Sequence, residues 1–111
     1  MNAEELYEIL EKSQGKKGYH LNPDREVTIP LLEGLLENKD RYGYMSCPCR
    51  LASGDRERDR DIVCPCIYRD PDLAEYDQCY CALYVSADWD PETMAGRYVP
   101  ERRPREKMAA F

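Results

Sequence analysis

Six cysteines fall in three pairs, each with a single residue between its two sulfurs. The pairs are Cys47-Pro48-Cys49, Cys64-Pro65-Cys66 and Cys79-Tyr80-Cys81, called here the first, second and third triplet. Residues two apart in an extended segment point to the same side, so each triplet can present two thiolates to a common centre. Proline stiffens the backbone of the first two triplets. The pattern therefore predicts a site that holds a metal or a cluster through cysteine sulfur.

Six thiolates are more than one such centre takes. Tetrahedral zinc and a cubane iron-sulfur cluster each accept four protein sulfurs. Four ligands would leave two cysteines, which could form a disulfide beside the centre. Two other interpretations stay open at this point: a structural zinc site with two idle thiols, and six buried cysteines with no ligand.

Two amphipathic segments precede the first triplet and must support it. In the first, Asn2 is the expected N-cap of a helix with Ala3, Leu6, Ile9 and Leu10 on its apolar face and Gly15 near its end.

In the second segment, Leu31, Leu32, Leu35 and Leu36 recur at helical spacing. Thr28 is the expected N-cap, Pro30 is expected in the first turn, and Gly43 is expected just after the end. Gly34 lowers the helix propensity of this segment without excluding the helix.

Later segments give weaker signals. The alternating charges from Asp55 to Asp61 predict a short, solvent-exposed helix. Asp70 before Pro71 predicts the start of another short helix. A turn or final helical turn is expected between Trp89 and Gly96. We expect one domain over residues 1–98, followed by a basic, frayed C-terminal tail over residues 99–111.

Composition narrows the class of protein. A chain of 111 residues suits a single domain, and 34% charged residues leave little apolar material to bury. Acidic residues outnumber basic ones by 22 to 16, giving a net charge of -6, which argues against a nucleic-acid partner. The sequence contains no P-loop, dinucleotide-binding, zinc-protease or serine-nucleophile motif.

We expect a cytoplasmic protein that does not contact a membrane. No apolar run approaches the roughly 18 residues of a transmembrane helix, and the acidic, amphipathic N-terminus does not resemble a secretory signal. In a reducing compartment, cysteines bind metal or perform redox chemistry more often than they form structural disulfides.

The order of the triplets resembles the catalytic chain of ferredoxin:thioredoxin reductase. That family carries two Cys-Pro-Cys motifs followed by a Cys-His-Cys motif, and Arg50, Gly34-Leu35 and Lys39-Asp40 add to the likeness, which covers about residues 3–90. The resemblance implies a mainly α fold: a small single domain of short helices and loops wrapped around a 4Fe-4S cluster, with an active-site disulfide next to the cluster.

The resemblance also implies a role for each cysteine. By motif, the cluster ligands would be Cys47, Cys64, Cys66 and Cys79. The redox-active disulfide would join Cys49, the exposed nucleophile, to Cys81, the sulfur held close to the cluster. The implied enzyme is an oxidoreductase that passes electrons from ferredoxin to a thioredoxin or a glutaredoxin-like protein. Plastid members work with a second, variable chain, and whether this chain does so stays open.

The chain departs from the family at one functional position. Tyr80 replaces the histidine of the third triplet, and the only histidine, His20, lies far away in sequence, which indicates a divergent member. Tyrosine is a poor proton shuttle near neutrality because its ordinary pKa is about 10, although it could hydrogen-bond a sulfur or pack against the cluster. Arg50 either favours a thiolate at Cys49 or is simply exposed.

Two functions of other classes remain as alternatives. One is a non-enzymatic iron-sulfur electron carrier, in which no substrate disulfide is attacked. The other is a zinc-stabilised protein-interaction module, in which four thiolates fold the cysteine-rich half.

Overall fold

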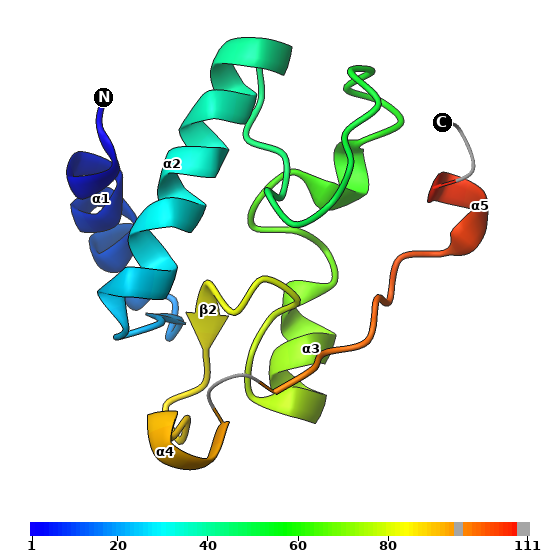
Figure 1. Ribbon diagram of the computed structural model, residues 1–111. Helices are drawn as coiled ribbons and strands as arrows, with labels where there is room; N and C mark the ends of the chain where they lie inside the picture. The colour runs from blue at the N-terminus through cyan, green and yellow to red at the C-terminus, as the bar shows by residue number, and fades with distance from the viewer. Residues whose placement is uncertain (95–96, 109–111) are drawn as a thin grey trace.

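The computed structural model describes residues 1–94 and 97–108 and shows a mainly helical fold, as predicted. In chain order, the elements are α1 (Ala3–Gly15), β1 (His20–Leu21), α2 (Arg25–Tyr42), the 3-10 helix η1 (Arg60–Ile62), α3 (Arg69–Tyr76), β2 (Tyr84–Val85), α4 (Pro91–Met94) and α5 (Arg105–Met108). Helices α1 and α2 lie side by side, and a long loop leads from α2 past η1 to α3 (Figure 1). This loop carries the first two triplets.

Helix α1 begins where the sequence predicts. The side-chain oxygen of Asn2 accepts a hydrogen bond from the backbone N–H of Glu5 at 2.9 Å, and the Glu5 carboxylate accepts one from the N–H of Asn2. This reciprocal pair is a capping box, which satisfies two backbone donors of the first turn. The buried face is narrower than predicted: Leu6 is buried, whereas Ile9 is 48% exposed.

Helix α2 begins one turn earlier than predicted, because Asp24 and not Thr28 is its N-cap. The Asp24 carboxylate accepts a hydrogen bond from the N–H of Glu26 at 3.0 Å, and Thr28 is buried inside the helix. Pro30 therefore lies in the second turn, on the exposed side, where the helical carbonyl group that loses its partner can reach water. Gly43 ends the helix with a left-handed φ of 88°, as predicted.

Helix α3 begins one residue before the expected cap. Tyr68 occupies the N-cap position, and Asp70 lies inside the helix rather than in front of it. The Asp70 carboxylate instead accepts a hydrogen bond from the Tyr19 hydroxyl at 2.7 Å, which connects α3 to the segment after α1. Pro71 lies in the first turn, as predicted.

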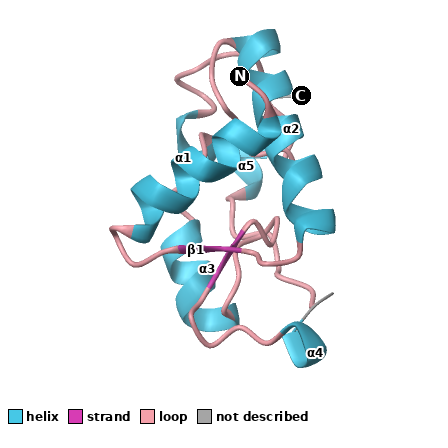
Figure 2. Cartoon of the chain, turned by 90° about the vertical axis from the view of Figure 1, so that its left-hand side faces the viewer, coloured by secondary structure: helices cyan, strands magenta, loops and turns pink. Residues whose placement is uncertain are grey.

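A two-stranded antiparallel sheet connects the α1–α2 half of the molecule to the third triplet. His20 pairs with Val85 and Leu21 pairs with Tyr84. Figure 2 shows the two strands beneath α1 and α2. The sequence predicted neither strand. Because β2 begins three residues after the third triplet, this pairing fixes the triplet relative to the helices.

The main hydrophobic core lies between α1, α2 and the segment around β2. Its buried members are Ala3, Leu6, Leu32, Leu35, Cys79, Leu83 and Tyr84. A second, smaller cluster consists of Cys47, Ile62 and Tyr68. Cysteines of the first and third triplets therefore belong to the two clusters that hold the fold together.

The charged stretch from Asp55 to Asp61 does not form the exposed helix that its pattern predicts. It forms turns followed by η1, and both Asp59 and Asp61 are buried. Burial is possible because both carboxylates accept hydrogen bonds inside the protein, Asp59 from the Tyr44 hydroxyl at 2.5 Å and Asp61 from the Tyr68 hydroxyl at 2.7 Å.

The part of the tail from 99 to 103 packs on the molecule, so the prediction of a frayed terminus is wrong there. Val99 and Arg103 are buried. Arg102 donates a hydrogen bond to Asp72 at 2.8 Å, and Arg103 donates one to Asp61 at 2.9 Å. In Figure 1 this segment, drawn in orange, passes beside α3 on its way to α5. Ion pairs with α3 and with the loop before it hold the tail in place.

The turn expected between Trp89 and Gly96 is confirmed as α4, and Gly96 itself lies outside the described residues. The boundary at residue 98 between a domain and a tail stays a prediction. Within residues 1–94 and 97–108, no helix combines the length and the apolar character that crossing a membrane requires.

Candidate functional site

Backbone hydrogen bonds bring the first and second triplets together. The N–H of Cys47 donates to the carbonyl oxygen of Ile62 at 2.8 Å, and the N–H of Cys64 donates to that of Met45, also at 2.8 Å. An antiparallel bridge lies between these two hydrogen bonds. The two triplets are therefore neighbours across a short ladder, although the charged stretch separates them in sequence.

Helix α2 supports the first triplet at Gly34. A Cβ atom at this position would lie 2.8 Å from the Cβ of Pro48, which is closer than two such atoms can approach. Only glycine lets the triplet pack this tightly on the helix. The glycine that lowered the helix propensity of the sequence is thus required by the position of the triplet.

The third triplet turns so that Cys79 faces inward. The N–H of Cys79 donates to the carbonyl oxygen of Tyr84 at 3.0 Å, and the N–H of Tyr84 donates to the Sγ of Cys79 at 3.3 Å. The side-chain amide of buried Asn22 donates to the carbonyl oxygen of Ala82 at 2.9 Å. Hydrogen bonds with the first residue of β2 therefore fix the position of Cys79.

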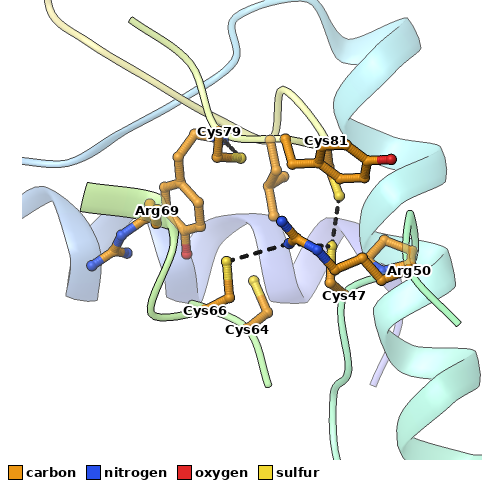
Figure 3. A pocket seen from close by; sticks show the side chains of 11 residues that line it. Cys47, Arg50, Cys64, Cys66, Arg69, Cys79 and Cys81 are labelled. Atoms are coloured by element: carbon orange, nitrogen blue, oxygen red, sulfur yellow. Dashed lines mark hydrogen bonds between the residues drawn. The ribbon is translucent and has the colours of Figure 1, made fainter. Parts of the chain in front are cut away.

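Five of the six cysteines line one pocket between the three triplets (Figure 3). They are Cys47, Cys64, Cys66, Cys79 and Cys81. The structure thus brings together all four residues that the sequence resemblance implies as cluster ligands, and it places Cys81 beside them. Cys49 is the one exposed cysteine and lines a neighbouring hollow with Leu51 and Tyr80.

No disulfide joins any of the six cysteines in this structure. The Sγ atoms of Cys47 and Cys81 lie 2.8 Å apart, and Cys49 is close enough to both for each to change the pKa of its thiol. The proposed redox partners Cys49 and Cys81 are therefore neighbours, although the disulfide between them stays a prediction.

The three neighbouring thiols differ in acidity. Hydrogen bonds with Cys47 and then with Cys81 lower the pKa of the Cys49 thiol, and the nearby Arg50 guanidinium adds to the lowering. The interaction with Cys49 raises the pKa of Cys47, and interactions with Cys47 and then with Cys49 raise the pKa of Cys81. Because the thiolate is the nucleophile in thiol chemistry, this group of sulfurs favours the reactive form at the exposed Cys49.

The remaining pocket cysteines are harder to ionise. Burial raises the pKa of Cys64 and Cys66, and it raises that of Cys79 to about 11. Metal ligation requires the deprotonated sulfur. Binding of a metal or a cluster in this pocket would therefore release protons.

Arg50 is buried beside the sulfurs, so the interpretation of a simple surface arginine is wrong. Its Nη1 atom lies 3.7 Å from the Sγ of Cys47 and 3.6 Å from that of Cys66. The guanidinium forms an ion pair with Glu101 at 2.7 Å. Figure 3 shows it directed into the pocket between the first and second triplets.

Sequence reasoning missed two residues of this site. Glu101 belongs to the tail that was expected to fray, and its contact with Arg50 spans the second half of the chain. Arg69 also lines the pocket, with its guanidinium 3.4 Å from the centre of the Tyr19 ring and 4.8 Å from that of Tyr84. No local pattern indicates either contact, because the partners are distant in sequence.

The arrangement of the sulfurs bears on the kind of group the pocket suits. Among residues 1–94 and 97–108, no three His, Cys, Asp or Glu side chains converge closely enough to hold a single metal ion. The cysteines instead line the wall of a shared pocket. Cysteine sulfurs around a pocket are donors that a metal or a cluster can use.

Comparison with known proteins agrees with the motif. A family model for the ferredoxin thioredoxin reductase catalytic beta chain matches residues 1–102. The ferredoxin-thioredoxin reductase catalytic chain of Porphyra purpurea is 30% identical over 90 residues, which cover 78% of this chain and 72% of that protein. The chloroplastic catalytic chain of Arabidopsis thaliana is 29% identical over 91 residues, which cover 80% and 60% of the two proteins.

The mainly helical fold, the cysteine-lined pocket and these matches define an oxidoreductase enzyme. The chain belongs to the ferredoxin thioredoxin reductase catalytic beta chain family.

Proposed function

We propose that this chain is an iron-sulfur disulfide reductase that transfers electrons from ferredoxin to a thioredoxin-like protein. The observation that carries the proposal is the division of the cysteines: one is exposed, and the other five line an inner pocket. A disulfide reductase needs one sulfur that a protein substrate can reach and further sulfurs that it cannot.

Four cysteines would hold a 4Fe-4S cluster: Cys47, Cys64, Cys66 and Cys79. The donor set fits, because such a cluster takes four cysteine thiolates. When bound, the cluster supplies one-electron chemistry next to the redox pair.

Cys49 and Cys81 would perform the disulfide exchange. The Cys49 thiolate attacks one sulfur of the substrate disulfide, forming a mixed disulfide and releasing the other substrate sulfur as a thiolate. Cys81, as a thiolate, then attacks the Cys49 sulfur. This second attack forms the Cys49–Cys81 disulfide and releases the second substrate thiolate. The substrate gains two electrons, and the enzyme pair loses two.

Tyr80 does not take over proton transfer in this proposal. Burial and then the charge of Glu101 raise the pKa of the Tyr80 hydroxyl above its ordinary value. A hydroxyl that holds its proton this firmly is a weak general acid near neutrality. Its ring lies instead against the Arg50 guanidinium, whose carbon is 4.5 Å from the ring centre.

The proposal is tested by anaerobic iron and acid-labile sulfide analysis together with an optical spectrum. Alkylatable thiols are then counted before and after reduction of the protein. We expect four irons, four sulfides and two thiols that become available only on reduction. Zinc without sulfide in protein made anaerobically would indicate an interaction module instead. A cluster without the extra thiol pair would indicate an electron carrier.

A further inference from the structure

Arg50 is a buried cation whose orientation is fixed by a carboxylate from the tail. Its side chain is 2% exposed, and a guanidinium so far removed from water needs close compensation. Glu101 provides it through two nearly parallel hydrogen bonds, from Nε at 2.8 Å and from Nη2 at 2.7 Å. Such bidentate pairing fixes the plane of the guanidinium. It leaves Nη1 to face the sulfurs.

Two tyrosine rings complete the surroundings of Arg50. The guanidinium carbon lies 4.5 Å from the centre of the Tyr80 ring and 5.2 Å from that of the Tyr68 ring, within the range of cation–π attraction. The Tyr68 ring is itself anchored, because its hydroxyl donates to Asp61. Tyr80 is the middle residue of the third triplet, so its ring joins that triplet to the arginine that follows the first.

The free edge of the guanidinium faces two implied ligand sulfurs, those of Cys47 and Cys66. Hydrogen bonds to ligand sulfur tune the reduction potential of an iron-sulfur centre. A fixed positive charge at this distance stabilises the more negative, reduced state of such a centre. Arg50 in its observed position should therefore raise the potential.

We propose that Tyr80 is a positioning residue whose ring, together with Glu101 and Tyr68, holds Arg50 against the Cys47 and Cys66 sulfurs and so raises the reduction potential of the cluster. The inference rests on the proposed function, since it presupposes the cluster. Tyr80, which replaces the histidine of the family's third triplet, would thus act through the electrostatics of the cluster. The ring face performs this task, and the hydroxyl takes no part in it.

The test is a redox titration of the complete, anaerobically prepared protein, with the midpoint potential of the cluster as the readout. Tyr80→Leu removes the ring, whereas Tyr80→Phe keeps it and removes only the hydroxyl. We expect Tyr80→Leu to lower the potential and Tyr80→Phe to retain the wild-type value. Arg50→Gln should lower the midpoint potential of the cluster by about 59 mV, which corresponds to a tenfold change in the equilibrium constant of a one-electron reduction.

A double variant shows whether Tyr80 acts through Arg50. If it does, adding Tyr80→Leu to Arg50→Gln causes no further change, because the positioned group is already gone. Arg102→Gln is the matched control, because it breaks the neighbouring tail ion pairs with Asp72 and Glu75, which involve neither Tyr68, Tyr80 nor Arg50. We expect the potential of Arg102→Gln to equal that of the wild type.

Each other result overturns the inference. An unchanged potential in Tyr80→Leu, an equal decrease in Tyr80→Phe, or an equal decrease in Arg102→Gln would show that the ring does not position Arg50 for this purpose. If Arg50→Gln does not assemble a cluster, the pair of Tyr80 variants decides alone. Absence of iron and sulfide from the wild type would overturn the proposed function and this inference together, and is distinguished by the metal analysis.

Discussion

Arg103 and Asp61 form an ion pair at 2.9 Å whose two side chains are only 2% and 3% exposed. One partner comes from the tail and the other from η1. Asp61 also accepts the hydroxyl hydrogen bond of Tyr68, whose ring lies beside Arg50. The pair therefore fastens the tail to the side of the molecule that carries the cysteine pocket.

We expect Arg103→Gln to destabilise the protein by roughly 3–5 kcal/mol, because it leaves a buried carboxylate without its cation. The measurement is the free energy of unfolding in urea under anaerobic conditions. Arg60→Gln is the control, since its ion pair with Glu57 is exposed on both sides and should change stability by less than about 1 kcal/mol. Equal losses in the two variants would contradict the assignment of stability to the buried pair.

Acid should weaken the fold through Asp59 and Asp61. Burial, the largest single cause, would raise the pKa of each carboxyl group. Hydrogen bonds from Tyr44, Ser53 and Gly54 to Asp59, and those from Tyr68 and Arg103 to Asp61 with the charge of Arg103, together outweigh it, so both pKa values lie below the ordinary value. A carboxyl group with a lowered pKa stabilises the fold above its unfolded pKa, about 3.9, and this contribution is lost as pH falls through the folded pKa.

The free energy of unfolding, measured from neutral pH down to about pH 3, should therefore decrease below about pH 4 in the wild type. Asp61→Asn lacks one of these carboxyl groups. Its free energy of unfolding should be lower at neutral pH and should decrease less steeply as the pH falls. Parallel curves for the two proteins would show that Asp61 does not contribute to the acid sensitivity.

Gly34→Ala should disturb the first triplet. The added Cβ would meet Pro48 at 2.8 Å, and overpacking of this kind typically costs about 1–3 kcal/mol, more than the roughly 1 kcal/mol that alanine contributes to helix propensity. We expect a lower urea midpoint and slower disulfide reduction. Gly15→Ala is the control because nothing lies within 4 Å of its Cβ position, and it should leave both quantities unchanged or raise the midpoint slightly.

Cys49→Ser and Cys64→Ser should fail in different ways. Cys49 is exposed and outside the pocket, so its serine variant should keep iron and sulfide at wild-type levels while losing disulfide reduction. Cys64 lines the pocket, so its serine variant should lose iron and sulfide and unfold more easily. Iron analysis and a thioredoxin-reduction assay separate the two results. Equal loss of iron in both variants would contradict the division into ligands and a redox pair.

The sequence predicted those parts of the fold that depend on neighbouring residues. Each of these features is defined by residues a few positions apart: the helix cap at Asn2, the left-handed helix end at Gly43, and the cysteine triplets. The structure contains the cap and the helix end, and it brings the triplets together around one pocket. The burial of Asp59 was not predictable in this way, because its partner Tyr44 lies outside the charged stretch. The strands were missed because each is two residues long and finds its partner in the other half of the chain.

In the candidate site, too, the sequence did not predict contacts between residues that are distant along the chain. The resemblance supplied a set of ligands that the structure gathers in one pocket, but the sequence alone did not place Arg50. Alternating charges and an arginine-rich tail look solvated when each is considered separately. Asp61 and Arg103 are buried because each neutralises the other, and pairing over such a distance leaves no local pattern.

The contact between Arg50 and Glu101 also has a consequence for the order of events during synthesis. A nascent chain that has reached Cys81 already contains all six cysteines, yet it lacks the carboxylate that fixes the buried guanidinium beside them. The ligand set is thus complete well before its electrostatic surroundings. The pocket reaches the form described here only after the segment that carries Glu101 has been made, and a truncated chain that stops at α4 would carry every sulfur without the counter-ion of Arg50.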